Sequence, residues 1–153
     1  MGQCQTAQLG VVEYDEAAVV HFPAGLPAFE NETRFLLIEQ DETRPVVFLQ
    51  SLATPSLLFL TLPAGIVDPG YRLELGADER ALLELAGDGP WAEGEDLVSL
   101  AILTVRPGNV VTANLLAPVV IGARSRRALQ VVQAESGYRL DFPVSGGAVP
   151  ACL

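Results

Sequence analysis

Short apolar runs separated by turn residues make up most of this chain. The runs are rich in Val, Ile, Leu and Phe and are bounded by Pro, Gly or pairs of acidic residues, a pattern typical of β-strands rather than long helices. The predicted strands are 9–14, 17–22, 35–40, 46–52, 57–62, 97–105, 112–121 and 129–133. We expect the first two to form a hairpin around Asp15 and Glu16.

One short helix is predicted, over about residues 77–86. Asp78 and Glu79 favour its first turn, apolar residues repeat at helical spacing, and Gly87 suits the position after its end. With these strands and no internal repeat, the sequence predicts a mainly β fold, a small antiparallel β-barrel-like domain. We place this single domain at 1–134 and expect 135–153, which is richer in Gly and Pro, to be a partly disordered C-terminal tail.

The run from Thr112 to Ile121 places two polar residues, Thr112 and Asn114, on an otherwise apolar strand. Because they are two residues apart, their side chains face the same way in an extended chain. Pro118 has no backbone N–H to donate, so the strand must lie at an edge or bulge there, or stop and restart. We interpret Thr112 and Asn114 first as buried polar groups that fix the strand register, and second as a contact surface.

Acidic residues dominate the charged positions and are unevenly distributed. The formal net charge is −10 in 153 residues. Residues 1–44 and 76–96 each carry a net charge of −6, whereas the segment from residue 122 onward carries +2. Nonspecific nucleic-acid binding needs clustered cations, so this charge argues against direct nucleic-acid binding. The acidic regions are either solvated surface or a docking face for a basic protein.

The sequence contains no run of eighteen apolar residues, so neither a membrane-spanning helix nor a membrane partner is expected. Cys4 and Cys152 lie near opposite ends of the chain, where chains are generally loose, and do not make a disulfide framework. No secretory signal is visible. These features together favour a reducing, cytoplasmic compartment.

No constellation for catalysis can be assembled. His21 is the single histidine and lies in an apolar run, where a structural role is expected more than a catalytic one. No serine lies in a nucleophile elbow, two cysteines and one histidine do not complete a zinc site, and no glycine-rich phosphate loop is present. We therefore expect neither an enzyme nor a metal or cofactor, while the many acids leave a carboxylate pair open.

Three segments together carry a family resemblance, and they are FPAGLPAFE at 22–30, PVVFLQSL at 45–52 and TANLLAPVVI at 112–121, followed by Arg124, Arg127 and Gln130. In this order and spacing they resemble FliW, the bacterial flagellar assembly factor, from about residue 9 to about residue 133. The chain departs from the family pattern at Ala28, where Gly is usual, and at Phe48, where Trp or Tyr is common. A loop tolerates Ala in place of Gly where φ is negative.

The resemblance implies a small, monomeric, cytoplasmic β-barrel-like protein that works without catalysis. FliW proteins bind flagellin and also CsrA, the RNA-binding repressor of flagellin translation. When flagellin is exported, freed FliW captures CsrA and relieves the repression. The implied partners are therefore flagellin and CsrA, with synthesis coupled to export by partner switching.

Nine residues are the expected partner-binding positions: Leu26, Phe29, Glu30, Gln50, Ser51, Thr112, Asn114, Arg124 and Arg127. The apolar loop 26–29 and a rim near 48–52 are expected to seat an amphipathic helix of flagellin, and the acidic regions to attract basic CsrA. For Leu26 and Phe29, a role as a lid on the core is as well supported as a role in binding a partner. The two arginines also fit a solvated strand end or an ion pair with the acidic regions of the same chain.

Two other classes of function stay open. One is a barrel that binds or hydrolyses a small apolar ligand through its carboxylates, and the other is an obligate oligomer whose interface uses the same rim. An internal cavity with converging polar groups would favour the ligand-binding barrel, whereas a filled interior with an apolar rim would favour the regulator.

Overall fold

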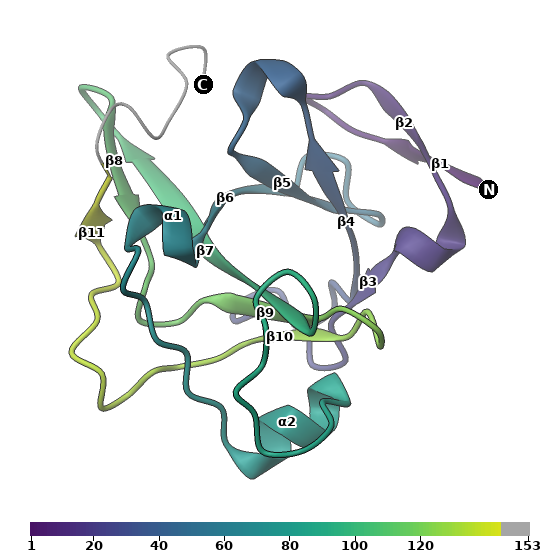
Figure 1. The fold of residues 1–153 in the computed structure, drawn as a ribbon. Coiled ribbons are helices and arrows are strands. Elements are labelled where there is room, and N and C mark those ends of the chain that lie inside the picture. Colours follow the sequence, from purple (N-terminus) through teal and green to yellow (C-terminus); the bar gives the residue numbers. More distant parts are fainter. Residues whose placement is uncertain (145–153) are drawn as a thin grey trace.

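A computed structural model of the chain describes residues 1–144, which form a strongly curved sheet with short helices on its outside (Figure 1). Among these residues the elements, in chain order, are β1 (Gly2–Gln5), β2 (Val11–Tyr14), η1 (Glu16–Ala18), β3 (Val20–His21), β4 (Arg34–Glu39), η2 (Asp41–Thr43), β5 (Val47–Ser51), β6 (Leu58–Pro63), α1 (Ala64–Val67), α2 (Ala77–Leu83), β7 (Leu97–Arg106), β8 (Val110–Ala113), β9 (Val119–Gly122), β10 (Ala128–Gln130) and β11 (Phe142–Pro143).

The main sheet is antiparallel in the order β10-β9-β7-β6-β5-β4-β3, and in addition β8 pairs with β7 and β11 pairs with β8. Its two ends approach each other, because a bridge joins His21 of β3 to Arg127 just before β10, and the His21 N–H donates to the Arg126 carbonyl at 2.8 Å. The strand order does not close into a full barrel, but this contact between the two end strands gives the sheet a barrel-like shape. The prediction of a mainly β, antiparallel, barrel-like fold with one short helix is confirmed.

The run predicted as one strand over 112–121 is two strands that share one partner. The second half of β7 pairs with β8, and its first half pairs with β9 along the same edge. Between them the Asn114 side chain accepts a hydrogen bond from the Ala117 N–H at 2.9 Å, closing a turn before Pro118. The strand therefore stops and restarts at the proline, which is one of the outcomes expected from its missing donor.

The core fills both faces of the central strands. One cluster, which includes Phe22, Phe35 and Leu49, lies on one face of β5, and a second, which includes Phe48 and Leu62, lies on the other. All five residues of β5 are buried as a result. The apolar rim expected near 48–52 is therefore wrong, because a strand paired on both edges and covered on both faces leaves no surface for a partner.

The N-terminal hairpin differs from the predicted one. Strand β1 pairs with β2, so the hairpin spans residues 2–14, and the acidic pair expected at its turn instead leads into the 3-10 turn η1. The Asp15 carboxylate accepts from the Ala17 N–H at 2.9 Å, which starts η1 and directs the chain away from β2. Cys4 is 2% exposed in this hairpin, so the loose terminus expected around it is wrong.

Helix α2 is shorter than the predicted 77–86. It begins after Gly76, whose N–H donates to the Glu79 carboxylate at 2.5 Å. It ends at Leu83 because Glu84 adopts a left-handed conformation with φ of 56° and the Leu85 N–H bonds back to the Arg80 carbonyl at 3.0 Å. Helix α1, a single turn that follows β6, was not predicted.

The segment 135–144, predicted as the start of a tail, packs on the body of the fold. Phe142 of β11 pairs with Ala113 of β8, and the Tyr138 ring stacks on Tyr71. The boundary placed at residue 134 therefore does not separate a domain from a tail. The rest of that predicted tail, 145–153, lies outside the described residues.

Candidate functional site

The loop 22–30 is a closed turn with one partly exposed aromatic ring. Leu26 is 3% exposed and belongs to the core, so it covers the core rather than offering itself to a partner. Phe29 is 39% exposed and packs edge-on against Phe59, with ring centroids 5.7 Å apart. Glu30 is exposed. Of the predicted anchors in this loop, the Phe29 ring and the Glu30 carboxylate remain available at the surface.

Backbone conformation in this loop is unusual at two positions. Gly25 has a φ of +67°, and a Cβ there would lie 2.5 Å from the Glu30 backbone, so glycine is required. Ala28 has a φ of +70°. The condition under which Ala replaces Gly without strain, a negative φ, is therefore not met, and Ala28 is held in the left-handed region that disfavours a Cβ.

Gln50 and Ser51 organise a turn and do not face outward. Gln50 is 0% exposed, and its Nε2 donates to the carbonyls of Ser51, at 2.9 Å, and Pro55, at 3.2 Å. The Ser51 hydroxyl donates to the Glu32 carboxylate at 2.7 Å, and the Thr54 hydroxyl bonds to the same carboxylate. These two hydroxyls lower the pKa of Glu32. Glu32 was not among the predicted residues, although it ties the loop 22–32 to the turn after β5.

The remaining predicted residues lie in two further places. Thr112 is buried on β8 and Asn114 closes the turn before β9, in agreement with their interpretation as structural residues. Arg127 lies 3.7 Å from the Glu84 carboxylate at the end of α2, which is the ion pair with the second acidic region that was expected as one alternative. Arg124 lines a hollow of about 330 Å³ beside the same helix. The nine predicted residues therefore do not form one site.

A groove among the described residues is lined by none of the nine predicted residues. It has a volume of about 690 Å³ and lies between the extended segment 71–75, α1 and the loop 88–93, with the start of β7 at its floor. Its apolar wall consists of Ala64, Tyr71, Leu73, Leu75, Pro90, Trp91 and Leu97. Its polar residues are Glu74, Arg80, Asp88, Glu93 and Ser99.

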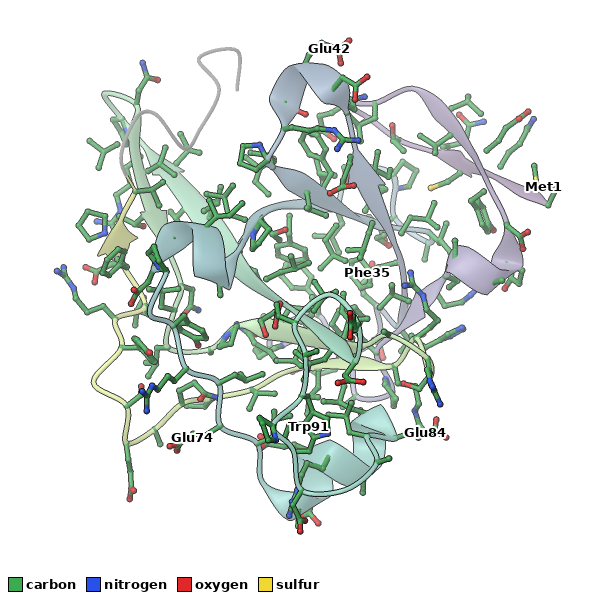
Figure 2. The ribbon with its side chains drawn as sticks, in the orientation of Figure 1. Met1, Phe35, Glu42, Glu74, Glu84 and Trp91 are labelled. Atoms are coloured by element: carbon green, nitrogen blue, oxygen red, sulfur yellow. The ribbon has the colours of Figure 1, made fainter. Side chains whose placement is uncertain are left out.

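Trp91 separates this groove from the smaller hollow, since both are lined by Asp88, Pro90 and Trp91. The indole Nε1 donates to the Ala86 carbonyl at 3.1 Å, which fixes the ring beside α2 (Figure 2). A Cβ at Gly89 would lie 3.1 Å from the ring, so this glycine lets the backbone fold closely over the indole. The aromatic ring therefore holds a fixed position between two hollows.

Glu93 is the groove carboxylate that bonds to the start of β7. It accepts hydrogen bonds from the Ser99 N–H at 2.5 Å and from the Ser99 hydroxyl at 3.1 Å. Ser99 is 2% exposed, whereas Glu93 itself keeps one side open to solvent. Burial against the floor raises the pKa of Glu93, and the two hydrogen bonds from Ser99 oppose this rise only in part.

The described part of the chain contains neither a cluster of metal-ligating side chains nor a membrane-spanning helix. Within residues 1–144, no group of three or more His, Cys, Asp or Glu side chains is arranged to hold a metal ion. In the same range, every helix is too short or too polar to cross a membrane.

Comparison with known proteins identifies the family. A family model described as FliW protein matches residues 3–144. The chain belongs to the FliW family. The resemblance inferred from the three sequence segments is therefore confirmed, and the FliW match extends beyond it at both ends, including the segment 135–144.

Relatives in this FliW family are named for flagellar assembly. A flagellar assembly factor FliW of Syntrophomonas wolfei subsp. wolfei is 36% identical over 137 residues, covering 89% of this chain and 84% of that protein. The FliW of Geobacillus kaustophilus is 35% identical, covering 85% and 86%. A crystal structure of the flagellar assembly factor FliW matches this fold with a TM-score of 0.82 at 31% identity, covering 93% of this chain and 96% of that one.

Proposed function

We propose that this chain is a non-enzymatic, cytoplasmic flagellar assembly factor that binds flagellin and, when free of flagellin, binds the translational repressor CsrA. The observation that carries this proposal is the match to relatives named flagellar assembly factor FliW over most of both chains. In this role the protein acts as a monomer whose two partners exclude each other. Flagellin export then releases it to antagonise CsrA.

The charge of the chain supports a basic protein partner. CsrA binds RNA and is therefore basic at its binding surface, whereas this chain carries a formal net charge of −10. Opposite charges on two proteins speed their encounter and disfavour competing anions such as RNA near the contact. A switch needs only that binding of one partner lowers affinity for the other, which negative coupling within one small domain provides.

The packing of the interior does not support the alternative of a barrel that binds or hydrolyses a small apolar ligand. Phe22, Phe35, Leu49 and Leu100 are each at most 1% exposed and fill the inside of the curved sheet. A ligand-binding barrel needs an internal cavity with a few converging polar groups. The filled interior instead favours a protein that works through its surface.

Titration calorimetry tests the proposal with two partners from the same genome, the C-terminal segment of flagellin and full-length CsrA. We expect each to bind, and we expect CsrA to be displaced when flagellin is added. If neither partner binds at about 100 μM, where the binding free energy is only a few kcal/mol, the proposed function is wrong. Raising the salt concentration should weaken CsrA binding, because charge steering is screened by ions.

A further inference from the structure

The groove between the segment 71–75 and the loop 88–93 combines an apolar wall with acidic groups. Leu73, Leu75 and Leu97 line it together with the rings of Tyr71 and Trp91. In Figure 2, Glu74 lies on the segment that leads from α1 to α2, and Trp91 lies beside α2. A hollow of about 690 Å³ has room for several side chains of a partner.

The charges in this groove are not balanced by the chain itself. Arg80 lies 3.1 Å from the Asp88 carboxylate, so these two charges neutralise each other. Within the described residues, neither Glu74 nor Glu93 forms an ion pair, and Glu93 is bound only to the neutral Ser99. The groove therefore presents two uncompensated carboxylates next to apolar and aromatic surface.

The ligand that complements such a groove is a chain segment with a cationic side chain between apolar ones. A Lys or Arg would pair with the carboxylates, its stem would pack on leucine side chains, and its charge would be favourable against the aromatic faces. Nucleic acid and acidic segments are disfavoured by the same carboxylates. Of the two proposed partners, CsrA is the basic one.

We propose that this groove is the docking site for a basic, amphipathic segment of CsrA, in which a Lys or Arg pairs with Glu93 and Glu74 while flanking apolar residues pack on Leu73, Leu75 and Trp91. This inference rests on the proposed function and assigns one of its two partners to a place on the molecule. The partly desolvated Glu93 gains its missing counter-charge only when the partner binds, which makes the pairing selective for cations.

The first test compares two double variants that remove the same charge. Glu74→Gln/Glu93→Gln removes the two groove carboxylates that form no ion pair among the described residues, and the Gln side chain at position 93 can still pair with the Ser99 N–H and hydroxyl. Glu39→Gln/Glu95→Gln removes two exposed carboxylates outside the groove lining. By calorimetry, we expect the groove variant to lose at least about tenfold in CsrA affinity relative to the matched control, and to bind flagellin within about twofold of the unaltered chain.

A second variant adds a bulky side chain to the groove lining without removing charge. Gly65 lines the groove on α1, and a Cβ there would meet no atom within 4 Å, so Gly65→Trp adds a side chain into open space. We expect it to fold and to lose CsrA binding by about tenfold or more, with flagellin binding retained.

The outcomes separate this inference from the proposed function. Equal losses of CsrA affinity in the two double variants would mean that net charge attracts CsrA and that the groove is not its binding site. Loss of flagellin binding instead of CsrA binding would overturn the choice of occupant. Absence of CsrA binding by the unaltered chain would overturn the proposed function together with this inference, whereas CsrA binding that survives both groove variants overturns the inference alone.

Discussion

The side-chain amide of Gln133 pairs with both backbone polar groups of Glu74: its Oε1 accepts from the Glu74 N–H at 2.8 Å, and its Nε2 donates to the Glu74 carbonyl at 2.9 Å. Gln133 is 4% exposed, and the segment 71–75 that it holds is extended but belongs to none of the strands. A side chain thus takes the place of a neighbouring strand. One wall of the groove depends on this contact.

Replacing Gln133 by Ala should therefore loosen the groove wall. The change leaves two backbone groups of Glu74 without their partner, and we expect the free energy of unfolding to fall by roughly 1–3 kcal/mol. The amide hydrogen of Glu74 should exchange faster with solvent, because local opening becomes easier. Urea unfolding and hydrogen exchange measure the two effects. Gln8→Ala, at an exposed position, is the control and should change stability by less than about 0.5 kcal/mol.

Glu93→Gln should stabilise the protein at neutral pH while weakening CsrA binding. Burial raises the pKa of Glu93 above its unfolded value, so the stability linked to this group is fully present below the unfolded pKa and is lost as pH rises through the folded pKa. We expect the Gln variant to gain less than about 1 kcal/mol at pH 7, because Glu93 is partly solvated, and to gain nothing at low pH. Urea unfolding across pH, with Glu95→Gln as control, checks this. A gain that is the same at every pH would contradict it.

Ala28→Gly should stabilise the loop. At a φ of +70°, the alanine Cβ crowds the backbone by roughly 1–2 kcal/mol, whereas glycine adopts this conformation without strain and loses only about 0.5–1 kcal/mol in chain entropy. The expected net gain is about 0.5–1 kcal/mol by thermal or urea unfolding. Ala24→Gly is the matched control in the same loop, where φ is not positive, and should destabilise. Equal effects of both changes would mean that Ala28 is not strained.

Ser51→Ala should destabilise the protein in a manner that depends on pH. The Ser51 and Thr54 hydroxyls lower the pKa of Glu32, so the stability linked to this carboxylate is present above its unfolded pKa and lost as pH falls through its folded pKa. At pH 7, we expect a loss of about 1–3 kcal/mol, since a hydrogen bond to a charged group is removed. The loss should shrink in acid. Ser56→Ala, exposed in the same turn, should be close to neutral at both pH values.

Elements whose pattern is local could be predicted from the sequence, and elements held by distant side chains could not. Strands β4, β5, β6 and β7 match predicted apolar runs, because alternation and flanking prolines are visible within each run. The segment 71–75 alternates apolar and polar residues, but the backbone N–H groups of Arg72 and Glu74 bond to the side chains of Tyr138 and Gln133, more than fifty residues away. No local signal marks such partners.

The candidate site was missed for the same reason. The groove gathers α1, the segment 71–75, the Trp91 loop and the start of β7, which meet only after the chain has folded. The family segments instead drew attention to Gln50 and Asn114, which hold turns together. A tryptophan in a loop between several glycines was the one local sign of this surface, because large aromatic rings are seldom left in a loop without a role.

The segment 135–144 is fastened to the rest of the fold by the Tyr138 ring and β11. The Tyr138 ring stacks on Tyr71 with centroids 4.4 Å apart and an interplanar angle of 29°, and its hydroxyl accepts from the Arg72 N–H at 2.8 Å. Ending the chain after Ala134 removes this ring and β11, and should cost about 3 kcal/mol or more relative to a chain ended after Val144, because partly buried aromatic surface and ladder hydrogen bonds are lost. Urea unfolding of the two chains measures the difference, and Tyr138→Ala in the longer chain isolates the contribution of the ring. Equal stability would restore residue 134 as the boundary, whereas the expected loss places β11 within the domain and Tyr138 among the supports of the groove wall.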